Sequence, residues 1–134
     1  MGEKVSAMIK KKLILADSDE RYLKELSCYF MENIPQFEVL VFTKQEKVHQ
    51  YLEQNGKADV LVVDEVFADA RIKALTSGMT RIMLSTGMSS TDGFETIKKY
   101  QRMESLSKSI LLKYAQDSNT LETVKGNSDT RITV

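Results

Sequence analysis

A chain of 134 residues with 42% hydrophobic and 28% charged residues has the size and composition of one globular domain. Its 19 basic and 19 acidic residues cancel, which excludes a global attraction to nucleic acid or to an anionic membrane and favours proteins or small ligands as partners. The single Cys28 excludes an internal disulfide, and no apolar run approaches the length of a membrane span, so we expect a cytoplasmic protein without membrane insertion.

The first predicted unit is a strand followed by a helix. Residues 13–16, reading LILA, form a short apolar run that Asp17 ends, which is the pattern of a strand buried on both faces. Ser18 or Asp19 can then cap a helix in which apolar residues repeat at helical spacing as far as Phe30. This pattern predicts a first βα unit.

A second strand, a second helix and a third strand continue the alternation. Residues 37–43, reading FEVLVFT, are rich in β-branched and aromatic residues and predict a strand, and residues 45–54 predict a helix that an Asn-Gly pair closes. Residues 59–63, reading DVLVV, form the most apolar strand, and Asp64 ends it. This composition places the third strand at the centre of the sheet.

The second half of the chain has shorter elements. We expect a helix of about two turns over 67–75, a strand over 81–85, a loop over 87–93, a short strand over 94–98 and a last helix over 103–115. Five strands alternating with helices predict an α/β fold whose parallel sheet is covered on both sides.

The domain boundaries follow from these elements and from the polar end of the chain. We expect a lead-in over 1–11, one domain over 12–115 and a polar linker over 116–130. The last residues, 131–134, contain two aliphatic side chains and are interpreted as the start of a following domain.

Polar residues end four of the five predicted strands. Asp17 and Ser18 follow the first strand, Asp64 the third, Ser85 the fourth and Lys99 the fifth. Functional groups of a parallel α/β sheet collect at the carboxyl ends of its strands. The carboxylates of Asp17 and Asp64 are suitable ligands for Mg²⁺, and a lysine and a hydroxyl can bind a phosphoryl group carried by Asp64.

Four motifs at these strand ends resemble the receiver domain of bacterial response regulators over residues 12–115. In LILADSDE the resemblance makes Asp17, Ser18 and Asp19 the acidic pocket, and in VLVVDEVF it makes Asp64 the phosphoacceptor. The motif IMLST contains Ser85 at the position of the switch hydroxyl, and TIKKY contains Lys99 at the position of the phosphate-pairing lysine. The resemblance implies a CheY-like, that is flavodoxin-like, doubly wound sheet of five parallel strands.

The sequence departs from the receiver pattern at three points. Ser18 replaces the acidic residue that ligates the metal, and Tyr100 replaces the proline that follows the lysine. The segments from Asp64 to Ser85 and from Ser85 to Lys99 are too short for full helices, so the family's third helix is shortened and its fourth is nearly missing. These departures favour a pseudo-receiver, in which the usual relay from site to surface has little to act on.

The motif KYQRMESLSKSIL and the ending DTRITV also resemble the N-terminal receiver-like domain of the pilus-assembly ATPases TadZ and CpaE. The leading hypothesis is therefore a non-enzymatic regulatory domain that binds a protein partner or forms a homodimer and localises or assembles an attached MinD/ParA-like ATPase. In this hypothesis Asp64 and Lys99 form a structural ion pair.

Two alternatives stay open. In the first, the domain is a working receiver, Asp64 accepts phosphate from a histidine kinase, and Asp17 and Asp64 hold Mg²⁺. In the second, the chain is a small α/β enzyme or a nucleotide-binding domain, which is disfavoured because the sequence has no Gly-rich phosphate loop and no nucleophile elbow.

Overall fold

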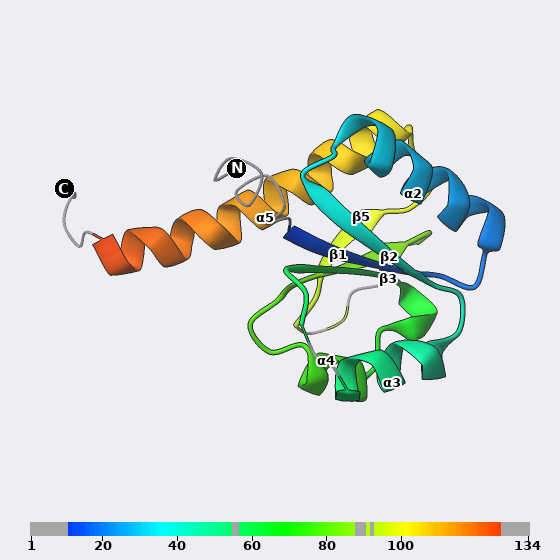
Figure 1. Cartoon of the computed structure of the whole chain (residues 1–134), viewed down its shortest axis with the longest axis horizontal. Helices are drawn as coiled ribbons and strands as arrows, with labels where there is room; N and C mark the ends of the chain where they lie inside the picture. The colour runs from blue at the N-terminus through cyan, green and yellow to red at the C-terminus, as the bar shows by residue number, and fades with distance from the viewer. Residues whose placement is uncertain (1–10, 55–56, 88–90, 92, 127–134) are drawn as a thin grey trace, which may run out of the picture.

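A single parallel sheet organises the chain, with helices on both of its faces (Figure 1). The computed structural model describes residues 11–54, 57–87, 91 and 93–126. The strands are β1 (Lys11–Ala16), β2 (Phe37–Phe42), β3 (Val60–Asp64), β4 (Thr80–Ser85) and β5 (Glu95–Lys98). Their order in the sheet is β2-β1-β3-β4-β5, and every neighbouring pair is parallel. This is the flavodoxin-like α/β fold that the sequence predicts.

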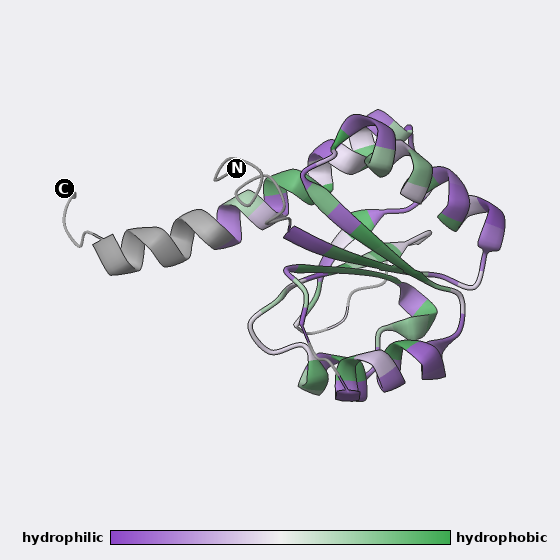
Figure 2. Ribbon diagram, viewed as in Figure 1, coloured by the Kyte–Doolittle hydropathy of each residue, from purple (hydrophilic) through white to green (hydrophobic). Residues whose placement is uncertain are grey.

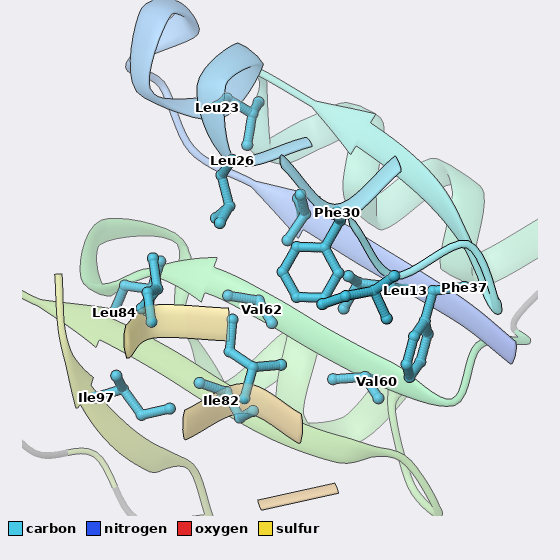
Figure 3. Close-up of a cluster of buried hydrophobic side chains, with 14 of the residues drawn as sticks. Leu13, Leu23, Leu26, Phe30, Phe37, Val60, Val62, Ile82, Leu84 and Ile97 are labelled. Atoms are coloured by element: carbon cyan, nitrogen blue, oxygen red, sulfur yellow. The ribbon is translucent and has the colours of Figure 1, made fainter. Parts of the chain in front are cut away.

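Two helices cover one face of the sheet. They are α2 (Glu20–Asn33) and α5 (Met103–Gly126), which lie on the same side of the sheet in Figure 1. Their apolar residues join those of the strands in one buried cluster, part of which Figure 3 shows around Phe30 and Val62. Aromatic rings tie the cluster together, since Phe37 of β2 packs edge-on against both Phe30 and Tyr114.

The opposite face has shorter helices. It is covered by α3 (Gln45–Gln54), the 3-10 helix η1 (Glu65–Phe67) and α4 (Ala70–Leu75). The cluster on this side contains Val48, Leu61, Met83 and Phe94. In Figure 2 the strands between the two clusters are coloured hydrophobic, while hydrophilic residues lie on the outer surfaces of the helices. Both faces of the central strands are therefore buried, as the apolar runs of the sequence predict.

The connection after β3 differs in detail from the prediction. The expected helix over 67–75 is divided into η1 and α4, because Asp64 and Asp69 each cap a separate turn. Asp64 accepts a hydrogen bond from the amide of Val66, and Asp69 accepts one from the amide of Ile72. The helix that the sequence predicts to be short is therefore present as two short helices, η1 and α4.

The connection from β4 to β5 contains no helix among its described residues, 86, 87, 91, 93 and 94. Phe94, which we expected in the strand, precedes β5 and packs into the cluster of the second face. Arg81 of β4 holds this connection in place by donating hydrogen bonds to the carbonyl oxygens of Gly93 and Lys73, at 3.0 and 2.7 Å. The residues 88–90 and 92 of the expected loop lie outside the described residues.

The last helix is longer than expected. The sequence predicts an end at Ala115, but α5 continues to Gly126, so residues 116–126 of the expected linker are helical. The side chain of Asp117 accepts a hydrogen bond from Thr80 Oγ1 at 2.8 Å, which fixes the helix to the start of β4. The predicted lead-in up to residue 10 and the segments 127–130 and 131–134 lie outside the described residues.

Candidate functional site at the carboxyl edge of the sheet

Three charged side chains are buried together at the carboxyl ends of the strands. Asp17 directly follows β1, Asp64 is the last residue of β3, and Lys99 directly follows β5; they are 2%, 6% and 4% exposed. Lys99 reaches across the end of β4 to the two acids. The sheet thus brings together three residues that are far apart in the sequence.

The ammonium group of Lys99 bridges the two carboxylates. Its Nζ lies 2.7 Å from Asp64 Oδ1, to which it donates a hydrogen bond, and 2.7 Å from Asp17 Oδ2. The contact with Asp17 has the distance of an ion pair but lacks the direction of a hydrogen bond, so Oδ2 has no hydrogen-bond donor among the described residues. One cation therefore balances two buried anions, and the site keeps one net negative charge.

Backbone amides fix the other oxygen of each carboxylate. Asp17 Oδ1 accepts a hydrogen bond from the amide of Asp19 at 2.9 Å, and Asp64 Oδ2 accepts one from the amide of Val66 at 3.1 Å. One oxygen of each carboxylate thus accepts a hydrogen bond from the backbone of its own loop, and the other oxygen contacts the ammonium group of Lys99. This arrangement leaves neither carboxylate free to turn without losing a bond.

Two tyrosines enclose Lys99. Its Nζ lies 5.1 Å from the ring centre of Tyr22 and 5.3 Å from that of Tyr100, and the two rings meet edge to face at 5.4 Å. The Tyr22 hydroxyl donates a hydrogen bond of 2.7 Å to the carbonyl oxygen of Lys99. Tyr100, which is 59% exposed, therefore covers the lysine at the position where the receiver family has a proline.

The surroundings raise the pKa of both Lys99 and Tyr22. Burial alone would lower the pKa of Lys99, but the close contacts with the carboxylates of Asp17 and Asp64 outweigh it, so the pKa lies above the usual value. Burial is the main cause of the raised pKa of Tyr22, and the charge of Lys99 opposes it. At neutral pH the lysine is therefore an ammonium ion and the tyrosine a neutral donor.

Ser85 is fully buried at the end of β4, but its contact is with Glu65 rather than with Asp64. Ser85 Oγ donates a hydrogen bond of 2.8 Å to Glu65 Oε1 and accepts one of 3.2 Å from the amide of Gly87. The Thr86 hydroxyl lies 3.4 Å from the other oxygen of Glu65. The predicted switch hydroxyl is thus already bound by a carboxylate of the chain itself.

The sequence interpretation did not include Glu65. Its position could have identified it, since an acid directly after a strand-ending aspartate lies at the carboxyl edge of a parallel sheet, where functional groups collect. The two other members of the predicted acidic pocket are exposed. Ser18 makes no side-chain hydrogen bond in the described part of the chain, and Asp19 caps α2 by accepting a hydrogen bond from the amide of Tyr22 at 3.1 Å.

These residues do not fit a Mg²⁺ site. Among the described residues, no group of three or more Asp, Glu, His or Cys side chains could hold a metal ion. Asp17 and Asp64 together supply two carboxylates, but the ammonium of Lys99 lies against both of them. Proteins usually hold Mg²⁺ with one or two carboxylates and several waters, but a cation at these two carboxylates would have to displace the ammonium of Lys99.

An open hollow lies beside Ser85, at the end of β4 and β5. It has a volume of about 510 Å³ and is lined by Thr86, Gly87, Thr96 and Lys98. Register explains the lining, since Thr96 pairs with Met83 and Lys98 with Ser85 across the two strands. The surface nearest the candidate site is therefore open.

Comparison with known proteins agrees with this geometry. Residues 9–115 match the model of the family described as TadZ-like, receiver domain. The chain belongs to this family. Since receiver domains are regulatory modules that act through protein interactions, the TadZ-like receiver domain described here is a regulatory domain of this kind.

Solved structures show the same fold at low sequence identity. A Francisella response-regulator receiver domain is 21% identical with a TM-score of 0.63, and the match covers 81% of this chain and 99% of that one. A CheY-like receiver from Methanospirillum hungatei is 17% identical with a TM-score of 0.69, covering 84% and 99%. A putative pilus assembly-related protein from Burkholderia pseudomallei is 16% identical with a TM-score of 0.61, covering 79% and 90%.

No curated protein gives a significant match to this sequence. The described residues of the TadZ-like receiver domain also include no helix of the length and apolar character that a membrane span requires.

Proposed function

We propose that this TadZ-like receiver domain is a pseudo-receiver, a protein-interaction domain that works without phosphorylation of Asp64. The observation that carries the proposal is the bridge from Lys99 to both Asp17 and Asp64. The same ammonium that would neutralise an incoming phosphoryl group lies between the carboxylates, where a metal ion would otherwise be needed.

The position of Ser85 supports the same proposal. A hydroxyl that senses a phosphoryl group has to be free to bind it, but Ser85 donates its hydrogen bond to Glu65. Phosphorylation would have to displace a carboxylate from this hydroxyl and add negative charge beside it. The hydrogen bond therefore opposes a phosphate-driven movement of Ser85.

The test is the response of the protein to an acyl-phosphate mimic. Amide NMR spectra recorded with Mg²⁺ and beryllofluoride should match those recorded with Mg²⁺ alone, because the pair of carboxylates is occupied by Lys99. Shifts that centre on Asp64, Ser85 and Lys99, and that Asp64→Asn abolishes, would support the working receiver instead.

The same proposal assigns the domain to the localisation or assembly of an attached MinD/ParA-like ATPase. It is supported by the match to the TadZ-like receiver model and by the likeness in fold to a protein described as pilus assembly-related. The coding sequence downstream of Val134 tests this part. A Gly-rich loop with a phosphate-binding lysine supports it, and a stop codon contradicts it.

A further inference from the structure

Two consecutive acids at the end of β3 contact two other strand ends. Asp64 pairs with the ammonium of Lys99, which follows β5. Glu65 accepts a hydrogen bond from Ser85, at the end of β4. The backbone joins the two contacts, since the amide of Lys99 donates a hydrogen bond of 2.9 Å to the carbonyl oxygen of Ser85. Among the described residues no lysine or arginine forms an ion pair with Glu65, so hydroxyl groups are the partners of its carboxylate.

The carboxylate of Glu65 binds two neighbouring hydroxyl groups, one with each oxygen. Ser85 Oγ donates to Oε1 at 2.8 Å, and Thr86 Oγ1 donates to Oε2 at 3.4 Å. The amide of Gly87 donates in turn to Ser85 Oγ at 3.2 Å, so a chain of hydrogen bonds runs from the backbone through the hydroxyl to the carboxylate. Hydrogen bonds in such a chain polarise one another, and those that end on a charge are the strongest. Glu65 therefore fixes residues 85–87, where β4 passes into its connection to β5.

We propose that the end of β4 is an anion-binding site that the chain occupies with its own carboxylate, that of Glu65, and that this ligand sets the conformation of the connection to β5. Two adjacent hydroxyl donors suit an anion with two acceptor oxygens, so the ligand class is a carboxylate. The proposal rests on the pseudo-receiver role of the domain and adds the group that holds Ser85 without a phosphoryl group on Asp64.

A free anion can reach this site once the Glu65 side chain is removed. Ser85 is fully buried, but Glu65 is only partly buried and Thr86 is exposed. Thr86 also lines the open hollow of about 510 Å³, together with Lys98. The positive charge of Lys98 attracts anions into this hollow. Truncation of Glu65 to alanine therefore leaves a space that formate, a carboxylate of minimal size, can enter from solvent.

The first experiment is chemical rescue of Glu65→Ala in the full chain, followed by amide NMR. We expect the substitution to shift the signals of Thr86 and Gly87, and also those of Gly93 and Phe94 at the far end of the connection. Sodium formate should return these signals toward their wild-type positions in a saturable manner, whereas sodium chloride at the same ionic strength should not. Glu32→Ala, on an exposed acid of α2, is the matched control and should leave all four signals unchanged.

A second variant tests whether formate binds to the hydroxyl. In Glu65→Ala/Ser85→Ala the main donor is missing, so formate should raise no recovery of the Gly87 signal. A recovery that survives Ser85→Ala places the anion elsewhere and overturns the proposal. So does a Glu65→Ala spectrum that formate leaves unchanged. Signals of Gly93 and Phe94 that Glu65→Ala does not move overturn the control of the connection by Glu65.

The outcome is distinguishable from that of the phosphorylation test. Formate rescue reports the ligand of Ser85 in the unmodified protein, whereas the beryllofluoride spectra report the state of Asp64. Failure of the rescue, with no response of the wild type to beryllofluoride, removes the anion site and leaves the pseudo-receiver proposal intact. Rescue together with a beryllofluoride response removes the pseudo-receiver proposal and leaves Glu65 as the resting ligand of Ser85.

Discussion

The buried carboxylates of Asp17 and Asp64 share one neutralising side chain, that of Lys99. Removal of that lysine would leave Asp17 and Asp64 facing each other in a site that is almost closed to water. Breaking a buried ion pair from one side costs more than the pair contributes as a whole, because the remaining charge keeps its desolvation penalty.

We therefore expect Lys99→Met to lower the free energy of unfolding by about 3–5 kcal/mol, measured by urea denaturation at pH 7. Lys98→Met is the matched control, since its side chain is exposed and its loss should change the free energy by about 0.5 kcal/mol or less. Addition of Asp64→Asn to Lys99→Met should recover part of the loss. An equal, small effect of the two lysine substitutions would contradict the buried bridge.

The raised pKa of Lys99 predicts a dependence of stability on pH. A lysine whose pKa is higher in the folded state contributes its stabilisation fully below the pKa of the unfolded chain, and loses it as the pH rises further. The stability difference between wild type and Lys99→Met should thus be constant from pH 7 to about pH 9 and shrink above about pH 10. The charge of Lys99 lowers the pKa of Tyr22, so the two proteins are compared in a Tyr22→Phe background, which removes the titration of Tyr22 from the difference. A difference that stays constant at high pH would count against this pKa.

The contact between Glu65 and Ser85 can be measured with a double-mutant cycle. We expect Glu65→Met and Ser85→Ala to be coupled by about 1 kcal/mol in unfolding free energy, because each removes one partner of the same hydrogen bond. Glu32→Met, on an exposed residue of α2, provides the control and should be additive with Ser85→Ala. Additive effects of the Glu65 and Ser85 substitutions would show that the bond does not hold the hydroxyl.

The sequence was sufficient to predict Asp17, Asp64 and Lys99 as neighbours, because each stands where an apolar run ends and strand ends share one edge of a parallel sheet. It could not predict Glu65, since a partly buried acid after a strand resembles the first residue of any exposed helix. It predicted Ser18 or Asp19 as the cap of the first helix but could not decide between them, nor between capping and the acidic pocket for Asp19, because capping and metal binding use the same residue types.

At the scale of the elements, the turn before β5 supplies a buried side chain to the second face of the sheet, where helices supply the others. Gly93 has a φ of 92°, a conformation that favours glycine, and Arg81 binds its carbonyl oxygen. This turn places Phe94 in the cluster of the second face. The core beneath β4 is thus filled by a loop residue.

Gly93→Ala should therefore lower the free energy of unfolding by about 1–2 kcal/mol, because an L-residue is strained at this φ. An added Cβ would also lie 2.5 Å from Cε of Lys73, although that flexible side chain can move. Gly87→Ala is the control, since its backbone is not in this region and the space around it is open. Thermal unfolding of the two variants decides the matter, and equal midpoints would contradict the role of the turn.

The boundaries of the elements show where sequence patterns are strong. The helix over 45–54 is confirmed at both ends, and the four strands with continuous apolar or β-branched runs are correct to within two residues at each end. The end of α5 was wrong because a polar composition was interpreted as a linker. Residues 116–125 contain neither proline nor glycine, so nothing in the backbone stops a helix before Gly126.

At the scale of the whole molecule, the hydrophobic pattern predicted a parallel sheet with the third strand at its centre. The most apolar strand, β3, does lie at the centre of the sheet, and all neighbouring strands are parallel. The doubly wound arrangement was predicted from the resemblance to receiver domains. Overall charge excluded classes of partner but could not name one, because a sum over the chain does not report where the charges lie.

The length of α5 also gives the molecule a mechanical property. Its last twelve residues continue beyond Tyr114 and, at about 1.5 Å each, carry the chain about 18 Å along the helix axis (Figure 1). Each residue also turns the chain by about 100°. Deleting one residue near Asn119 would therefore swing an attached group through more than a quarter of a circle, whereas deleting seven would shorten the arm and nearly preserve its heading. The number of residues in α5 therefore sets both the distance and the direction in which the chain leaves the domain.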